Sequence, residues 1–216
     1  MPLKDDLIER TLEQLAEVVR DLTKVHQRER AEAFLQGAYQ EHTGTDASLL
    51  KQLPSEQLLG ILSSAGTVDR EKAFLMGALF QAEAQVQLQQ GVSGTAWQLK
   101  ALDLHLEAAL AELDLDEVDT QISFLVGELS AFALPAVTEW RLFEYARFRG
   151  AYAEAEDRLY ALLEQQGYSE VLAQKGNQFY QTLLNTPLEK LESGGLPRAE
   201  VVEGLASFEA ELADLK

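Results

Sequence analysis

The segment that most constrains the fold is RFRGAYAEAEDRLYALL, residues 147–163, in which one glycine separates two helical patterns. A glycine at that point lets the backbone adopt a positive φ, so Gly150 predicts a tight turn between two helices. Ala151, Ala153 and Ala155 follow the turn, and small side chains let two helices approach closely. The large apolar residues expected to fill the space around this contact are Trp140, Leu142, Phe143, Leu159 and Leu162. The segment therefore predicts a helical hairpin.

Most of the chain carries the same helical signature. Apolar residues make up 46% of the 216 residues. The composition is dominated by Leu, Ala, Glu and Gln, which are strong helix formers. Only 5 residues are proline, and no run of β-branched residues is long enough for a buried strand. The sequence therefore predicts an all-α fold of antiparallel helix hairpins, with roughly nine or ten helices and short connections.

The expected helices follow one another closely. They span residues 4–25, 28–42, 48–53, 56–66, 70–90, 95–113, 118–134, 136–149, 151–166, 169–185 and a last segment after 193–195. Ser55 and Asp69 precede two of them and are expected to act as N-caps. The first helix carries an apolar stripe of Ile8, Leu12, Leu15, Val19 and Leu22.

The hairpin around Gly150 resembles the turn of the tetratricopeptide repeat (TPR). That family's helix pair has a Gly-x-Tyr-x-x-Ala turn and a large apolar residue four positions later, and Gly150, Tyr152, Ala155 and Leu159 match it. The resemblance implies an irregular TPR-like array. The order of segments over residues 4–165 is also similar to an uncharacterised bacterial family of TPR-like proteins, which implies a fold and no known activity.

A polar link at 193–195 divides the expected TPR-like helical domain, residues 1–193, from a C-terminal amphipathic helix, residues 194–216. The apolar stripe of this helix consists of Val201, Leu205, Phe208, Leu212 and Leu215. The stripe either caps the array, as the terminal elements of repeat proteins do, or docks onto a partner. The sequence leaves both alternatives open.

The TPR resemblance also implies a peptide-binding face. TPR proteins bind peptides with first-helix residues at set positions before the turn, and these positions hold Trp140, Glu144, Arg147 and Phe148. An aromatic anchor beside a cation suits an acidic peptide or a C-terminal carboxylate. The alternative interpretation is that Trp140 and Phe148 belong to the core and that the arginines pair with acids on a solvated surface.

The sequence offers no motif for catalysis. It has no cysteine, so thiolate nucleophiles and zinc–thiolate sites are excluded. His26, His42 and His105 lie far apart, and none belongs to a His-Glu-x-x-His motif. Phosphate-binding glycine loops and the Gly-x-Ser-x-Gly elbow are absent as well. We therefore expect no catalytic residue, no metal site and no cofactor, and a protein that is not an enzyme.

Charge limits the partners that the chain is expected to bind. The 36 acidic and 18 basic residues give a formal net charge of −18, which repels phosphate backbones and anionic lipid surfaces. We expect neither nucleic-acid nor membrane binding. The N-terminus has no apolar segment typical of a signal peptide, and we expect a cytoplasmic protein.

These observations favour a non-catalytic module that binds a protein or a peptide, in a process that the sequence does not identify. An alternative is a structural homo-oligomer, such as a homodimer, that associates through its terminal amphipathic helices. A third is an enzyme or a helical protein that binds a small ligand, which would need a pocket of convergent polar groups.

Overall fold

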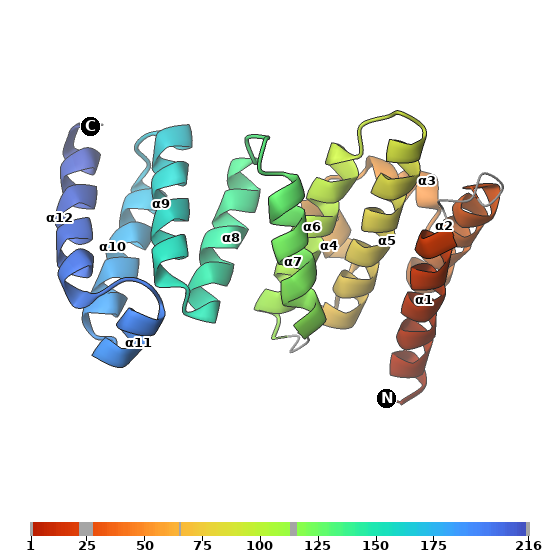
Figure 1. The fold of residues 1–216 in the computed structure, drawn as a ribbon, viewed down its shortest axis with the longest axis horizontal. Helices are drawn as coiled ribbons and strands as arrows, with labels where there is room; N and C mark the ends of the chain where they lie inside the picture. The colour runs from red at the N-terminus through yellow and green to blue at the C-terminus, as the bar shows by residue number, and fades with distance from the viewer. Residues whose placement is uncertain (1, 22–27, 65, 113–115, 215–216) are drawn as a thin grey trace. The chain divides into compact units, whose positions relative to one another are not determined.

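The computed structural model describes residues 2–21, 28–64, 66–112 and 116–214. It confirms the all-α prediction: these ranges contain twelve helices, and neighbouring helices within each compact unit pack antiparallel (Figure 1). The chain divides into two compact units, residues 1–133 and 134–216. The division at residue 193 predicted from the sequence stays a prediction.

The first unit contains seven helices within its described residues. They are α1 (Pro2–Asp21), α2 (Arg28–Thr43), α3 (Ala47–Gln52), α4 (Ser55–Ile61), α5 (Arg70–Gln89), α6 (Thr95–Leu110) and α7 (Asp116–Glu128). The antiparallel pair α5–α6 forms the centre of this unit, with α1 and α2 packed on α5 and α7 packed on α6. Helix α5 is buried on most sides because its apolar residues surround its axis, as Phe74, Leu75, Leu79 and Phe80 illustrate.

A small strand pair interrupts the helices of the first unit. No stable strand was expected from the sequence, yet β1 (Ser63–Ser64) pairs antiparallel with β2 (Thr67–Val68). The helix expected over residues 56–66 therefore ends at Ile61. Gly66, with a φ of +83°, lies in the connection between the two strands, where a left-handed residue favours a tight turn.

The second unit, as far as residue 214, contains five helices: α8 (Ala136–Arg149), α9 (Tyr152–Gln166), α10 (Glu170–Leu184), α11 (Leu188–Ser193) and α12 (Arg198–Asp214). Helices α8 and α9 form the hairpin predicted around Gly150, whose φ of +73° and ψ of 17° are left-handed. Their buried residues join those of α10 and α12 in one core, which includes Phe143, Phe179 and Phe208.

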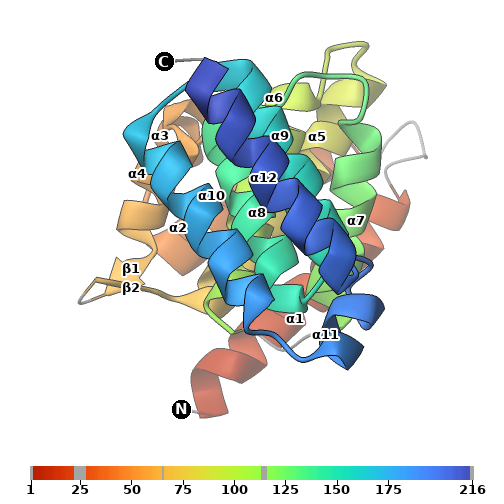
Figure 2. The same ribbon diagram turned by 90° about the vertical axis from the view of Figure 1, so that its left-hand side faces the viewer.

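Helix α12 packs along α10 within the same chain (Figure 2). Val201, Phe208 and Leu212 of its predicted stripe are buried, and Leu205 is half-buried. Leu215, the last member of the stripe, lies outside the described residues. The guanidinium of Arg198, at the start of α12, donates to the backbone carbonyls of Leu183, Leu184 and Thr186 at the end of α10. These bonds satisfy carbonyls that a helix C-terminus otherwise leaves without a partner.

Candidate functional site

The face predicted to bind a peptide lies on α8. Trp140, Glu144 and Arg147 are four and three residues apart, and this spacing places them on one side of the helix. The side chain of Trp140 is half-buried, and its ring meets that of Phe143 edge-on, with centroids 5.5 Å apart. One side of the indole therefore belongs to the core of the second unit while the rest reaches the surface.

A charged cluster lies beside Trp140. The Glu144 carboxylate accepts from Nη1 of Arg147 at 2.6 Å and from Nζ of Lys175 at 3.1 Å, one oxygen to each cation. Lys175 comes from α10, and its Nζ lies 5.3 Å from the centre of the Trp140 ring. The Arg147 guanidinium lies 5.4 Å from the centre of the Phe143 ring. Two cations, one carboxylate and an aromatic ring thus share one surface across α8 and α10.

Phe148 stands at the edge of this surface. Its side chain is 53% exposed, and its position one turn after Glu144 places it on the same side of α8. Arg158 of α9, by contrast, forms ion pairs with Glu139 at 3.2 Å and with Glu154 at 3.7 Å. Arg158 therefore pairs with other carboxylates and not with Glu144.

Lys175 is the member of the cluster that sequence reasoning missed. It lies in a helix whose local pattern carries no turn motif like that at Gly150, so nothing in its neighbourhood marks it. The spacing of the helices is the feature of the sequence that could have indicated Lys175. Helix α8 begins at Ala136 and α10 at Glu170, so Glu144 and Lys175 lie at similar distances from the starts of their helices, and the two side chains form an ion pair.

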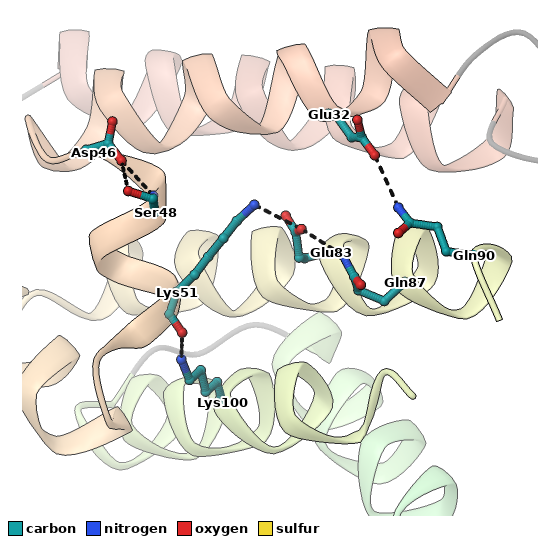
Figure 3. A network of polar contacts seen from close by, with 8 residues as sticks. All are labelled: Glu32, Asp46, Ser48, Lys51, Glu83, Gln87, Gln90 and Lys100. Atoms are coloured by element: carbon teal, nitrogen blue, oxygen red, sulfur yellow. Dashed lines mark hydrogen bonds and ion pairs between the residues drawn. The ribbon is translucent and has the colours of Figure 1, made fainter. Parts of the chain in front are cut away.

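A second polar network lies in the first unit (Figure 3). Nζ of Lys51, at the end of α3, lies 2.9 Å from the buried carboxylate of Glu83 on α5, which also accepts from the Gln87 amide at 3.5 Å. Lys100 of α6 donates to the Lys51 carbonyl. The network ties the short helix α3 to the central pair, and Glu32 of α2 adds a bond to Gln90 at 3.1 Å.

Aromatic rings line this network. Nζ of Lys100 lies 5.0 Å from the centre of the Trp97 ring, which stacks on Phe80 at 5.7 Å. Burial lowers the pKa of the Lys100 ammonium. Burial, together with the nearby charge of Glu83, raises the pKa of the Tyr39 phenol well above its usual value. The contacts of these residues account for the position of α3, and nothing in them aligns a nucleophile with a base.

The histidines do not converge. His26 lies outside the described residues. His42 contacts Oγ1 of Thr11 through its Nε2 at 2.8 Å, and burial lowers its pKa. His105 is completely buried between α5 and α6, and burial lowers its pKa to about 3. In the ranges that the structure describes, no group of three or more His, Cys, Asp or Glu side chains is arranged to hold a metal ion. Within the same ranges, no helix is both long and apolar enough to cross a membrane.

The chain belongs to a family of unknown function (DUF6483), which matches residues 2–213. A search of curated proteins found no match, and a search of solved structures found none either. Membership of the family assigns no activity, so the case for a function depends on the residues of this chain.

Proposed function

We propose that the second unit is a TPR-like, non-catalytic module that binds a protein or a peptide through the face formed by α8 and α10. The observation that carries the proposal is the Glu144 carboxylate held between Arg147 and Lys175 beside the half-buried ring of Trp140. Arg147 and Lys175 already bind one carboxylate, that of Glu144. The same two donors can therefore bind a carboxylate of a partner.

The arrangement of the helices supports the TPR-like part of the proposal. The starts of α8 and α10 are separated by the 34-residue period of the TPR family, and each is followed by a helix that packs back on it, α9 and α12. The left-handed Gly150 lies at the first turn. Helix α11 is an insertion in the second pair, which makes the array irregular. In this arrangement α8 and α10 are the two first helices, whose exposed surfaces form the binding face in TPR proteins.

The chemistry of the face indicates the class of partner. Arg147 and Lys175 supply cations, and the exposed edge of Trp140 and the Phe148 ring supply apolar surface. An acidic peptide, or a peptide whose C-terminal carboxylate follows an apolar residue, satisfies both. The net charge of −18 disfavours extended polyanions such as nucleic acid or an anionic membrane, whereas a single carboxylate needs only the two cations of this face.

The test is binding of immobilised random heptapeptides that carry either a free or an amidated C-terminus, followed by calorimetry on the selected peptides. We expect the wild-type protein to select peptides with a carboxylate. The double variant Trp140→Ala/Arg147→Glu is expected to lose at least tenfold in affinity. Lys175→Glu changes an exposed side chain and is expected to weaken binding without disturbing the core.

The matched control is Lys190→Glu, which makes the same charge reversal on an exposed residue of α11. Circular dichroism establishes that each variant is folded. If wild type selects no peptide, or if Lys190→Glu weakens binding as much as Lys175→Glu, the α8–α10 face is not the binding site.

The homo-oligomer suggested by the terminal amphipathic helices stays a prediction. The described part of the α1 stripe packs on α5, and that of the α12 stripe packs on α10, both in the same chain. Sedimentation of the protein over a hundredfold range of concentration tests for self-association.

A further inference from the structure

An apolar groove of about 320 Å³ opens in the first unit between α1, α5 and α7. Figure 1 shows α1 and α7 on opposite sides of α5. Leu12, Leu15 and Val19 of α1 form one wall, Phe74 and Ala78 of α5 form the floor, and Phe124 of α7 forms the opposite wall. This volume lies at the lower end of the range that small-molecule pockets occupy, and apolar walls are typical of them.

Three carboxamides converge on the groove. Gln81 and Gln85 lie one turn apart on α5, and Gln121 reaches it from α7. All three side chains are half-buried, and in the part of the chain that the structure describes none of them has a hydrogen-bond partner. Each carboxamide carries two donors and an acceptor, so a half-buried site holds several unused polar atoms. In the described ranges none of their polar atoms is both buried and without a partner, so water satisfies them until a ligand that offers the same hydrogen bonds replaces it.

Charge is nearly absent from the groove. Of the residues that line it, Glu117 alone is charged, and its side chain is exposed. A ligand with a phosphate or carboxylate head would lose water there without gaining a cation in return. An uncharged ligand loses little free energy on leaving water, because the carboxamides replace the hydrogen bonds that its polar group made to water.

We propose that this groove binds a small, uncharged, largely apolar molecule that carries at least one hydrogen-bonding group. The apolar body of the ligand lies between the α1 wall and Phe124, and its polar group bonds to the carboxamides of Gln81, Gln85 and Gln121. The groove is separate from the α8–α10 face and belongs to the other unit of the chain. Ligand binding by the groove is therefore independent of the peptide-binding proposal.

The test uses two fluorescent probes with the same ring system and different charge. N-phenyl-1-naphthylamine is neutral and has one N–H donor, and 8-anilino-1-naphthalenesulfonate adds a sulfonate to the same rings. We expect saturable binding of the neutral probe to the full chain, and at least tenfold weaker binding of the sulfonate. The absence of saturable binding by the neutral probe, or equal affinity for both probes, would overturn the proposal.

Two variants locate the binding. Ala78→Phe fills the groove and is expected to weaken neutral-probe binding at least tenfold, whereas Ala96→Phe, on an exposed position of α6, leaves binding unchanged. Gln85→Lys places a cation in the groove and is expected to strengthen sulfonate binding about tenfold. This second variant changes a half-buried surface position, so it keeps the test decisive if Ala78→Phe does not fold. Binding that neither variant alters would show that the probe lies elsewhere.

Discussion

The ring of Phe208 on α12 packs directly over Gly176 on α10. The two are so close that a Cβ at Gly176 would overlap the ring atom Cζ of Phe208. Phe208 is completely buried, and its ring centre lies 5.8 Å from that of Tyr180 and 6.2 Å from that of Tyr160. Because Gly176 has no side chain, the Phe208 ring can pack against the backbone of α10.

The first prediction follows from this contact. Gly176→Ala is expected to lower the free energy of unfolding by about 1–3 kcal/mol, because the added methyl group displaces the Phe208 ring in a packed core. Alanine alone would raise the free energy of unfolding by about 1 kcal/mol in a helix interior, so the two effects have opposite signs. Urea unfolding followed by circular dichroism measures the difference.

The matched control is Gly127→Ala on α7. A Cβ there meets no atom within 4 Å, so the helix propensity of alanine acts alone and the variant is expected to gain up to about 1 kcal/mol. Equal stabilisation by both substitutions would contradict the role assigned to the Gly176–Phe208 contact.

A second prediction concerns the turn between α8 and α9. Gly150 has a φ of +73°, and a Cβ would not come within 3.4 Å of any neighbour, so strain rather than a clash limits substitution. Gly150→Ala is expected to cost about 1 kcal/mol, and Gly150→Asn less, because asparagine tolerates left-handed backbone better. Thermal unfolding of the two variants ranks them. A ranking in which alanine is the less damaging of the two would argue against a left-handed Gly150.

The sequence predicted those features that depend on neighbouring residues. The turn at Gly150 is one, and the N-cap Asp69 is another, since its carboxylate accepts from the backbone N–H of Lys72 at 3.3 Å. Ser55 was wrongly expected to be an N-cap. Pro54 occupies that position, and Ser55 is the first helical residue.

Features that depend on distant contacts were not predicted. Helix α11, residues 188–193, lies between the helix expected to end at residue 185 and the polar link at 193–195, where no helix was expected, and Leu191 anchors it by packing into the core of the second unit. Helix α7 ends at Glu128, although the apolar pattern continues to residue 134. The pairing of Lys175 with Glu144 spans 31 residues and leaves no mark on the periodicity of either helix.

A third prediction concerns the loss of stability at acidic pH. His105 is buried as a neutral ring with a pKa near 3, whereas in the unfolded chain its pKa is about 6.5. Between these values the unfolded state binds a proton that the folded state does not, so stability is complete above about pH 6.5 and falls as the pH decreases. This group alone is expected to reduce the free energy of unfolding by about 1.4 kcal/mol at pH 5.5 relative to pH 7.5.

The control for this effect is His105→Leu, measured by urea unfolding at both pH values. Within the described residues neither ring nitrogen of His105 has a hydrogen-bond partner, so an apolar replacement removes no bond. The variant is expected to lose most of the pH dependence and to retain the stability of the wild type at pH 7.5. His42, whose lowered pKa acts in the same direction, accounts for part of what remains. An unchanged slope would refute the assignment to His105.

The last prediction tests the ion pair between Lys51 and Glu83. The Glu83 side chain is only 5% exposed, so Lys51→Met leaves a buried carboxylate whose remaining hydrogen-bond partner among the described residues is the Gln87 amide at 3.5 Å. The variant is expected to cost about 2–3 kcal/mol. In the double variant Lys51→Met/Glu83→Met the uncompensated charge is gone, and stability is expected to return to within about 1 kcal/mol of the wild type. A double-mutant cycle by urea unfolding measures this coupling. Strictly additive losses would mean that the two side chains do not depend on each other, and α3 would then be held in place by the bond from Lys100 to the Lys51 carbonyl and by apolar contacts such as those of Leu50.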